Sequence, residues 1–151
     1  MKIIFLDIDG VLNSEKYLRL FGGYGVGIDD SRLEFIKEIV DATGALIVLS
    51  TSWREHWDND DVGCDNIGKE INKIFSSKGL KIYDKTPSLN CRREVEIEQW
   101  LFEHPETENF VVIDDMFLES EKIKGHFVKT NNYKIGIEKE NAVLAIDILN
   151  G

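Results

Sequence analysis

Cysteine and proline are scarce in this sequence, and both shortages limit what the chain can be. Two cysteines, Cys64 and Cys91, stand far apart among 151 residues, with no Cys-x-x-Cys motif and no neighbouring histidine cluster. The sequence therefore indicates neither a disulfide framework nor a zinc site, and we expect reduced thiols in a cytoplasmic protein. Pro87 and Pro105 stand singly, and no linker rich in proline and glycine divides the chain. We therefore expect residues 1–151 to form one domain.

Long apolar runs and an excess of basic residues are also missing. The first apolar run ends at Asp7, which makes it too short for the core of a signal peptide or for a membrane span. The chain has 18 lysines and arginines against 28 aspartates and glutamates, a net charge of −10. This balance argues against membrane binding and against strong non-specific binding to nucleic acid, although it allows a local basic pocket.

The most informative stretch lies within the first thirteen residues. Residues 3–6 are four consecutive apolar residues, a pattern typical of a strand buried on both faces of a parallel sheet. Asp7 and Asp9 follow where this run ends, and Gly10 allows a sharp turn or a close approach of the backbone to a ligand. Ligands of open α/β sheets bind beyond the carboxyl ends of the strands, so this stretch is a candidate site. Taken alone, it is also compatible with an ordinary polar turn.

Predicted strands and helices alternate along the rest of the chain. The patterns predict further strands at residues 45–49, 80–83, 110–113 and 127–128, and helices at 31–44, 67–79, 92–104, 117–124 and the C-terminal end. Residues 21–27, Phe-Gly-Gly-Tyr-Gly-Val-Gly, are expected to form a loop or small hairpin, because they lack the Gly-x-Gly-x-x-Gly spacing of a nucleotide-binding turn. The alternation implies an α/β fold with a doubly wound, mostly parallel sheet and helices on both faces.

Three of the predicted strands end in polar residues. These are Asp7 and Asp9 after the first strand, residues 50–52 (Ser-Thr-Ser) after the second, and Asp114 and Asp115 after the strand at 110–113. In a parallel sheet these ends share one edge, where four carboxylates raise one another's pKa unless a cation neutralises them. Mg²⁺ suits this oxygen-rich set, since it binds one or two carboxylates and keeps several waters. The neighbouring hydroxyls and backbone N–H groups, at Thr51 and Gly10 for example, suit phosphate oxygens.

These segments resemble the motifs of the haloacid dehalogenase (HAD) superfamily of phosphohydrolases. Residues 5–12, Phe-Leu-Asp-Ile-Asp-Gly-Val-Leu, are similar to its first motif, residues 47–50 to its second and residues 111–115 to its fourth. Residues 50–54, Ser-Thr-Ser-Trp-Arg, and the pattern that follows Arg93 resemble more narrowly the small HAD domains associated with RNA-repair proteins. The resemblance covers nearly the whole chain and implies a Rossmann-like HAD core.

The resemblance also implies a Mg²⁺-dependent phosphatase that works through an aspartyl-phosphate. Asp7 would be the nucleophile, Asp9 the acid that protonates the leaving oxygen and later activates water, and Ser50 a phosphate ligand. Metal contacts would come from the Asp7 side chain, the Asp9 backbone carbonyl, and Asp114 or Asp115. Anionic Asp7 attacks an anionic phosphate in this scheme, so a metal and a fixed cation are needed to offset the repulsion.

The fixed cation is where the sequence departs from the superfamily, whose third motif is most often a lysine. Here Arg92 and Arg93 stand at the start of a predicted helix, and Lys85 precedes them. We favour Arg93, because its spacing to the residues that follow matches the narrower group and a guanidinium binds phosphate in a bidentate way. The alternative is that both arginines belong to the solvated surface. Arg54 is a second candidate for substrate contact, beside Trp53, which either packs or stacks.

The expected substrate follows from the short segments between the motifs. Residues 10–30 and 53–66 are 21 and 14 residues long, too short for a cap with its own core. An open site suits a phosphorylated substrate that is a macromolecule, such as a nucleic acid with a phosphorylated end or a phosphorylated protein. Two other functions stay open at this point. One is a phospho-accepting receiver domain, against which the order of parts argues, since receivers place the paired acids after the first strand and here the pair Asp114 and Asp115 comes late. The other is a module that recognises phosphorylated ends without turnover.

Overall fold

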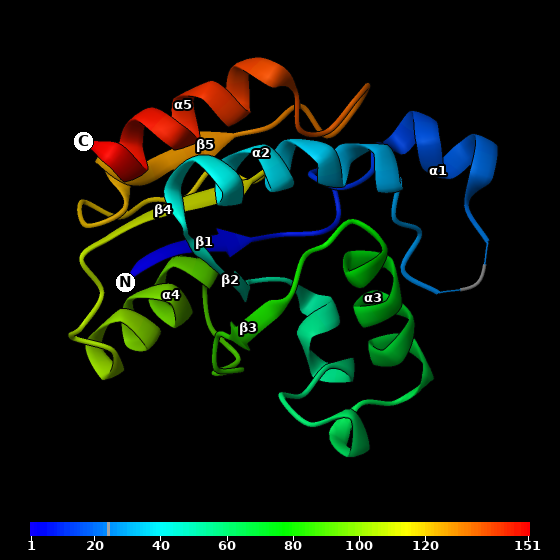
Figure 1. The fold of residues 1–151 in the computed structure, drawn as a ribbon, viewed down its shortest axis with the longest axis horizontal. Helices are drawn as coiled ribbons and strands as arrows, with labels where there is room; N and C mark the ends of the chain where they lie inside the picture. Colours follow the sequence, from blue (N-terminus) through cyan, green and yellow to red (C-terminus); the bar gives the residue numbers. More distant parts are fainter. Residues whose placement is uncertain (24) are drawn as a thin grey trace.

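The structure is a computed structural model that describes residues 1–23 and 25–151 (Figure 1). Its centre is a five-stranded sheet in the order β3-β2-β1-β4-β5, and every strand pair is parallel. The strands are β1 (Lys2–Leu6), β2 (Leu46–Leu49), β3 (Ile82–Lys85), β4 (Asn109–Asp114) and β5 (Phe127–Lys129). The apolar first strand lies in the middle of the sheet, where burial on both faces explains its composition.

The α-helices of the described chain are α1 (Glu15–Phe21), α2 (Leu33–Thr43), α3 (Asn66–Ser77), α4 (Arg93–Glu103) and α5 (Lys139–Asn150). Short 3₁₀ turns lie at Asp30–Arg32, Ser52–His56, Asp61–Gly63 and Lys124–His126. Local chemistry explains several ends: Gly44 ends α2 with a φ of 71°, and the Asp65 carboxylate begins α3 by accepting from two backbone N–H groups. In the part of the chain that the structure describes, helices are too short or too polar to cross a membrane.

The two faces of β1 belong to two different apolar clusters. Ile4 and Leu6 pack in the cluster that includes α2 and α5, whereas Ile3 and Phe5 pack in the cluster that includes α4. The Phe5 ring meets the Trp100 ring of α4 edge to face, with centroids 5.3 Å apart. Figure 1 shows α2 and α5 on one side of the strands and α4 on the other. The expected doubly wound α/β fold is therefore confirmed.

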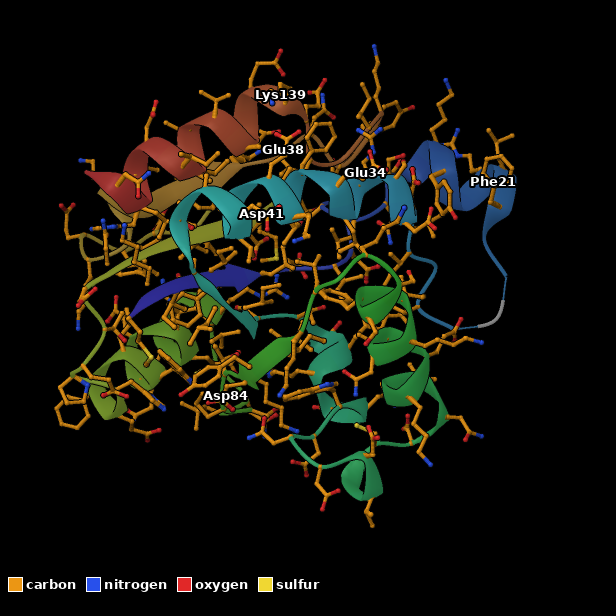
Figure 2. All side chains as sticks on the ribbon, in the orientation of Figure 1. Phe21, Glu34, Glu38, Asp41, Asp84 and Lys139 are labelled. Atoms are coloured by element: carbon orange, nitrogen blue, oxygen red, sulfur yellow. The ribbon has the colours of Figure 1, made fainter. Side chains whose placement is uncertain are left out.

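Helices α2 and α5 lie side by side on their shared face of the sheet. At the solvent side of this contact, Lys139 Nζ of α5 lies 2.7 Å from Glu38 Oε2 of α2, and both side chains are labelled in Figure 2. Both groups are largely exposed, so the pair contributes little to stability. The apolar residues beneath, including Ile36, Ile39 and Ala142, hold the two helices on the sheet.

The strand order excludes the receiver alternative. Receiver domains are flavodoxin-like sheets with the order 2-1-3-4-5, in which the third strand lies next to the first. Here β1 lies between β2 and β4, and β3 is at the edge beyond β2. This is the 3-2-1-4-5 order of Rossmann-like sheets.

Two segments differ from their predictions. The predicted helix at 117–124 is wrong: residues 117–120 have no regular secondary structure, residues 121–123 form a turn, and a 3₁₀ turn follows at Lys124–His126. Leu118 and Ile123 are buried, but they are five positions apart and Phe117 is 74% exposed, so these residues form no helical stripe. The third strand starts two residues later than predicted, at Ile82.

Helix α1 was not predicted, because none of its residues is buried and it therefore has no apolar stripe. Its signal is the N-cap at Ser14, whose hydroxyl accepts from the Tyr17 N–H at 3.0 Å. Residues 22–23 and 25–29 form a loop without strands. Of the two expected structures for this stretch, a loop or a small hairpin, the described residues therefore form the loop. Tyr24, the second aromatic residue of the glycine-rich stretch, lies outside the described residues.

Candidate active site

The ends of the three central strands meet at one edge of the sheet. Leu6 of β1 is in register with Leu49 of β2 and Ile113 of β4, so the next residue of each strand comes to the same place. The Asp7 N–H donates to the Ile113 carbonyl at 3.1 Å, and the Ser50 N–H donates to the Leu6 carbonyl at 2.9 Å. The structure thus brings together the polar residues that the sequence analysis placed at these ends.

Three aspartates gather at this edge. Asp7, Asp114 and Asp115 each offer one carboxylate oxygen, and these oxygens lie within 4.8 Å of one another. Asp7 and Asp114 are buried, and Asp115 is partly exposed. Burial raises the pKa of Asp7 well above its usual value, and the Asp114 charge raises it further. Burial also raises the pKa of Asp114. A set of carboxylates whose charge is this unfavourable without a cation fits a hard divalent ion such as Mg²⁺.

Arg93 bridges two of these acids. Its Nη1 lies 3.0 Å from Asp7 Oδ2 and 2.7 Å from Asp114 Oδ2, at the first turn of α4. Burial lowers the pKa of Arg93, but the charges of the two aspartates outweigh this effect and hold the pKa above its usual value. The guanidinium therefore stays charged, and it places a fixed positive charge in contact with Asp7 and Asp114.

The other two candidate cations point elsewhere. Arg92 is exposed, and its Nε lies 3.5 Å from Glu94 Oε1. Lys85 Nζ donates to the backbone carbonyls of Arg54 and Trp57, at 3.2 and 2.5 Å. Of the three candidates for the fixed cation, Arg93 is thus the one in contact with the aspartates, and the predicted substrate contact of Arg92 has no support from its surroundings.

Asp9 is held by two side chains, Trp53 and Asn13, whose contacts with it were not predicted from the sequence. Trp53 Nε1 donates to Asp9 Oδ2 at 2.8 Å, and Asn13 Nδ2 donates to Asp9 Oδ1 at 3.2 Å. Asn13 also accepts from the Gly10 N–H at 2.8 Å, so it joins the Asp9 carboxylate to the turn that follows it. Trp53 is 44 residues from Asp9, and its place after Ser52 gives no signal of this contact. A metal contact from the Asp9 backbone carbonyl stays a prediction.

In the described part of the chain, Ser50 places a buried hydroxyl without a protein partner at the end of β2. Its side chain is 1% exposed, and its Oγ finds no hydrogen-bond partner among the described residues. A buried hydroxyl without a partner costs about 1–3 kcal/mol, which a phosphate oxygen at this point would recover. Thr51 is also buried, but its Oγ1 accepts from the Trp53 N–H at 3.4 Å and begins the 3₁₀ turn at Ser52–His56.

Gly10 allows the first turn to pass close to Asp115. Its φ is 82°, and a Cβ there would lie 2.4 Å from Asp115 Oδ2. The Gly10 carbonyl accepts from Thr130 Oγ1 at 2.7 Å, and Asn132 Nδ2 donates to Asp115 Oδ2 at 3.0 Å. Two residues that follow β5, Thr130 and Asn132, thus support the acid cluster. They lie outside the sequence motifs, which gave no sign of this role.

Arg54 has a buried partner within the protein. Its Nη2 lies 2.8 Å from Glu96 Oε2, and its Nη1 donates to the Thr51 carbonyl at 2.8 Å. Glu96 lies on α4, one turn after Arg93, so this ion pair joins the chain that follows β2 to the helix that carries the site's cation. These contacts indicate a structural role, and the predicted contact of Arg54 with substrate stays untested.

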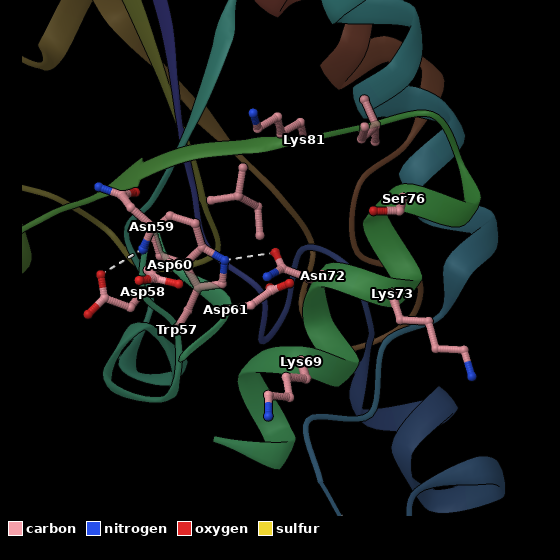
Figure 3. A pocket seen from close by; sticks show the side chains of 12 residues that line it. Trp57, Asp58, Asn59, Asp60, Asp61, Lys69, Asn72, Lys73, Ser76 and Lys81 are labelled. Carbon is pink, nitrogen blue, oxygen red and sulfur yellow. Dashed lines mark hydrogen bonds between the residues drawn. The ribbon is translucent and has the colours of Figure 1, made fainter. Parts of the chain in front are cut away.

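The largest cavity described lies away from the cluster of Asp7, Asp114 and Asp115. It has a volume of about 770 Å³ and lies between the loop after Trp57 and helix α3 (Figure 3). Three aspartates (Asp58, Asp60, Asp61) and three lysines (Lys69, Lys73, Lys81) are among its lining residues. Trp57 Nε1 donates to Asn72 Oδ1 at 2.8 Å across its wall. None of the residues predicted for the site lines this cavity, so volume alone does not mark the site.

The comparisons with known proteins agree with this geometry. The family described as "HAD domain in Swiss Army Knife RNA repair proteins" matches residues 3–142. No curated protein and no solved structure matches the chain. The family match indicates a phosphatase-type function, and HAD domains typically use Mg²⁺, for which the three-aspartate cluster is suited. The match covers most of the chain and includes the three strand ends, so this chain belongs to the family of HAD domains found in Swiss Army Knife RNA repair proteins.

Proposed function

We propose that this protein is a Mg²⁺-dependent phosphomonoester hydrolase with Asp7 as its nucleophile. The observation that carries the proposal is the position of Arg93, whose guanidinium contacts both Asp7 and Asp114. Ser50, whose N–H donates to the carbonyl of Leu6 next to Asp7, has a hydroxyl that is buried and without a partner among the described residues. Together these groups provide a nucleophile, a fixed positive charge and a hydrogen-bonding group for one phosphate.

The proposed reaction has two steps. In the first, an Asp7 carboxylate oxygen forms a bond to phosphorus, the ester P–O bond breaks, and Asp9 gives a proton to the leaving alcohol. In the second, Asp9 takes a proton from water, whose oxygen attacks the phosphorus and releases inorganic phosphate and the Asp7 carboxylate. Arg93 favours the ionised form of Asp7 and balances the charge of the phosphoryl oxygens. The metal held by Asp7, Asp114 and Asp115 would supply further positive charge.

The surroundings of Asp9 fit an acid and base that needs a fixed position. Trp53 and Asn13 each donate to one of its carboxylate oxygens, and Asp9 itself is exposed. An exposed carboxyl is accessible to both the leaving group and water. The two donors limit the rotamers that it samples, which aids proton transfer in a fixed geometry.

We further propose that the phosphate belongs to a larger substrate, with a nucleic-acid end as the first choice. Among its described residues, the segment between Asp9 and Ser31 contains as helices the seven-residue helix α1 and the start of a short 3₁₀ turn, and α1 has no buried residue. The segment after Ser52 contains two 3₁₀ turns before α3 begins. Neither provides an enclosing layer with its own core, and the matching family takes its description from RNA repair proteins.

Trapping of the covalent intermediate tests the proposal. We expect hydrolysis of an aryl phosphate to need Mg²⁺ and to stop with a chelator, and we expect mass spectrometry to find phosphate, or its beryllium fluoride mimic, on Asp7. Asp7→Asn should abolish turnover, whereas Asp9→Asn should slow breakdown of the intermediate more than its formation. Asp61→Asn, at an exposed aspartate of the large cavity, is the matched control. Binding of phosphorylated ends without any turnover would instead indicate a recognition module, and full activity without metal would refute the proposal.

A further inference from the structure

A second cavity, lined in part by the residues that follow Asn132, has a different character. Its volume is about 420 Å³, and it lies between α1 and the chain that follows β5. The residues that line it are Lys16, Arg19, Tyr133, Lys134 and Ile135. Three of the five are basic and none is acidic, on a chain with a net charge of −10. The cavity is therefore a local concentration of positive charge on an acidic protein.

Backbone contacts fix this cavity to the acid cluster. The N–H groups of Glu15 and Lys16, at the start of α1, donate to the carbonyls of Asn132 and Tyr133, at 2.9 and 3.3 Å. Asn132, next to Tyr133 in the chain, donates from its side chain to Asp115 Oδ2 at 3.0 Å. Figure 1 shows α1 beside the loop that precedes α5. Tyr133, which lines the cavity, is thus the chain neighbour of a residue that contacts the acid cluster.

The basic side chains of the cavity are available to a ligand. Among residues 1–23 and 25–151, the Lys16 and Lys134 ammonium groups make no ion pair. Arg19 has only a long, exposed contact of 3.8 Å to Glu15. Tyr133 is 55% exposed, which leaves much of its ring facing solvent. Cations around an exposed aromatic ring are the combination that binds single-stranded nucleic acid, through backbone phosphates and a stacked base.

We propose that this cavity binds the single-stranded nucleic-acid segment next to the phosphate held at Asp7. The inference deepens the proposed function and rests on it for the place of the terminal phosphate. Lys16, Arg19 and Lys134 contact phosphodiester groups, and a base stacks on Tyr133. A phosphopeptide would use the basic groups and would leave the exposed aromatic ring without a role, so nucleic acid is the better fit.

The acidic character of the whole chain does not oppose this binding at physiological salt. The Debye length there is about 8 Å, so acids farther away are largely screened from a phosphate in the cavity. The charges that line the cavity act at contact distance and are screened much less. Binding should therefore be local, weak outside this cavity and sensitive to salt.

Fluorescence anisotropy with short labelled oligonucleotides tests the inference in chelator, so that no hydrolysis is needed. The probes carry a 5′-phosphate, a 3′-phosphate or no terminal phosphate. With three phosphodiester contacts, affinity should fall about 20-fold between 50 and 200 mM salt. The triple variant Lys16→Ala/Arg19→Ala/Lys134→Ala should bind more weakly and lose most of this salt dependence. Tyr133→Ala should weaken binding by about 5- to 150-fold, and Tyr133→Phe should retain it.

A charge-matched triple variant provides the control. Lys69→Ala/Lys73→Ala/Lys81→Ala removes three exposed positive charges from the large cavity of Figure 3 and should leave binding close to that of the wild type. Equal weakening by both triple variants, or weakening by neither, would overturn the inference. So would a phosphopeptide whose binding, unlike that of the oligonucleotides, depends on the second cavity. Oligonucleotide binding that depends on this cavity in a protein without phosphatase activity would refute the proposed function and leave this site standing.

Discussion

Removal of the Arg54 guanidinium should destabilise the fold, because it would leave a buried charge alone. Arg54 and Glu96 have side chains that are 9% and 5% exposed, and their charged atoms lie 2.8 Å apart. Removing one partner of a buried ion pair lowers the free energy of unfolding by about 3–5 kcal/mol. For a chain of this length, this corresponds to a fall in Tm of about 6–20 °C. We therefore expect Arg54→Met to show this loss in urea and thermal unfolding.

Two further variants separate this effect from a general effect of charge. Arg54→Met/Glu96→Gln removes both charges while keeping an acceptor for the Leu89 N–H, which now donates to Glu96 Oε2 at 2.8 Å. It should be more stable than Arg54→Met. The exposed pair Lys37–Asp41 has a similar separation of 2.6 Å, and Lys37→Met should cost only about 0.2–0.5 kcal/mol. Wild-type stability in Arg54→Met, together with a raised KM for an aryl phosphate, would show that Arg54 contacts substrate instead.

Three other predictions concern the acid cluster. Arg93→Ala should lower kcat about 10²–10³-fold, whereas Arg92→Ala should change it little; equal small losses would remove Arg93 from the site. Gly10→Ala should weaken Mg²⁺ binding in calorimetry, because the new Cβ meets the Asp115 carboxylate and the positive φ adds strain of about 1–2 kcal/mol; unchanged affinity would contradict this packing. In chelator, the pKa of Asp7 is higher in the folded state than its value of about 4 in the unfolded state, so the wild type should lose stability as the pH rises from about 4 through the raised pKa. Asp7→Asn has no titrating group at this position, so urea unfolding should show a smaller loss of its stability over the same pH range.

The sequence predicted the parts of the site that depend on where strands end. Asp7, Ser50 and Asp114 each follow an apolar run, and parallel pairing then brings them together whatever the loops do. The contact between Trp53 and Asp9 could not be found in this way, since it depends on how the chain after β2 folds back. The same holds for the support of Asp115 by Asn132.

Two other limits of the sequence patterns have physical causes. Arg54 was predicted as a candidate substrate contact and not as half of a buried ion pair, because a buried charge is recognised only through its partner, and Glu96 is 42 residues away. The segment at 117–124 has enough apolar residues for a helix, but only Leu118 and Ile123 are buried and their spacing fits a turn. Burial that follows no helical periodicity depends on tertiary contacts, and a short stretch of sequence read by itself does not predict it.

Helix α4 sets the tolerance of this site to changes in chain length. Arg93 and Glu96 are three positions apart, so they project from nearly the same side of the helix, one toward the aspartates and one toward Arg54. One residue inserted between Arg93 and Glu96 would rotate the Glu96 side chain by about 100° around the helix axis relative to Arg93, and would shift it by about 1.5 Å along that axis. Among its described residues, 22–23 and 25–29, the loop after α1 makes hydrogen bonds with Leu12, Asn13 and Tyr17 and none with α4. Natural or engineered variation in length should therefore concentrate in that loop, while the first turn of α4 and the turn at Gly10 keep their register.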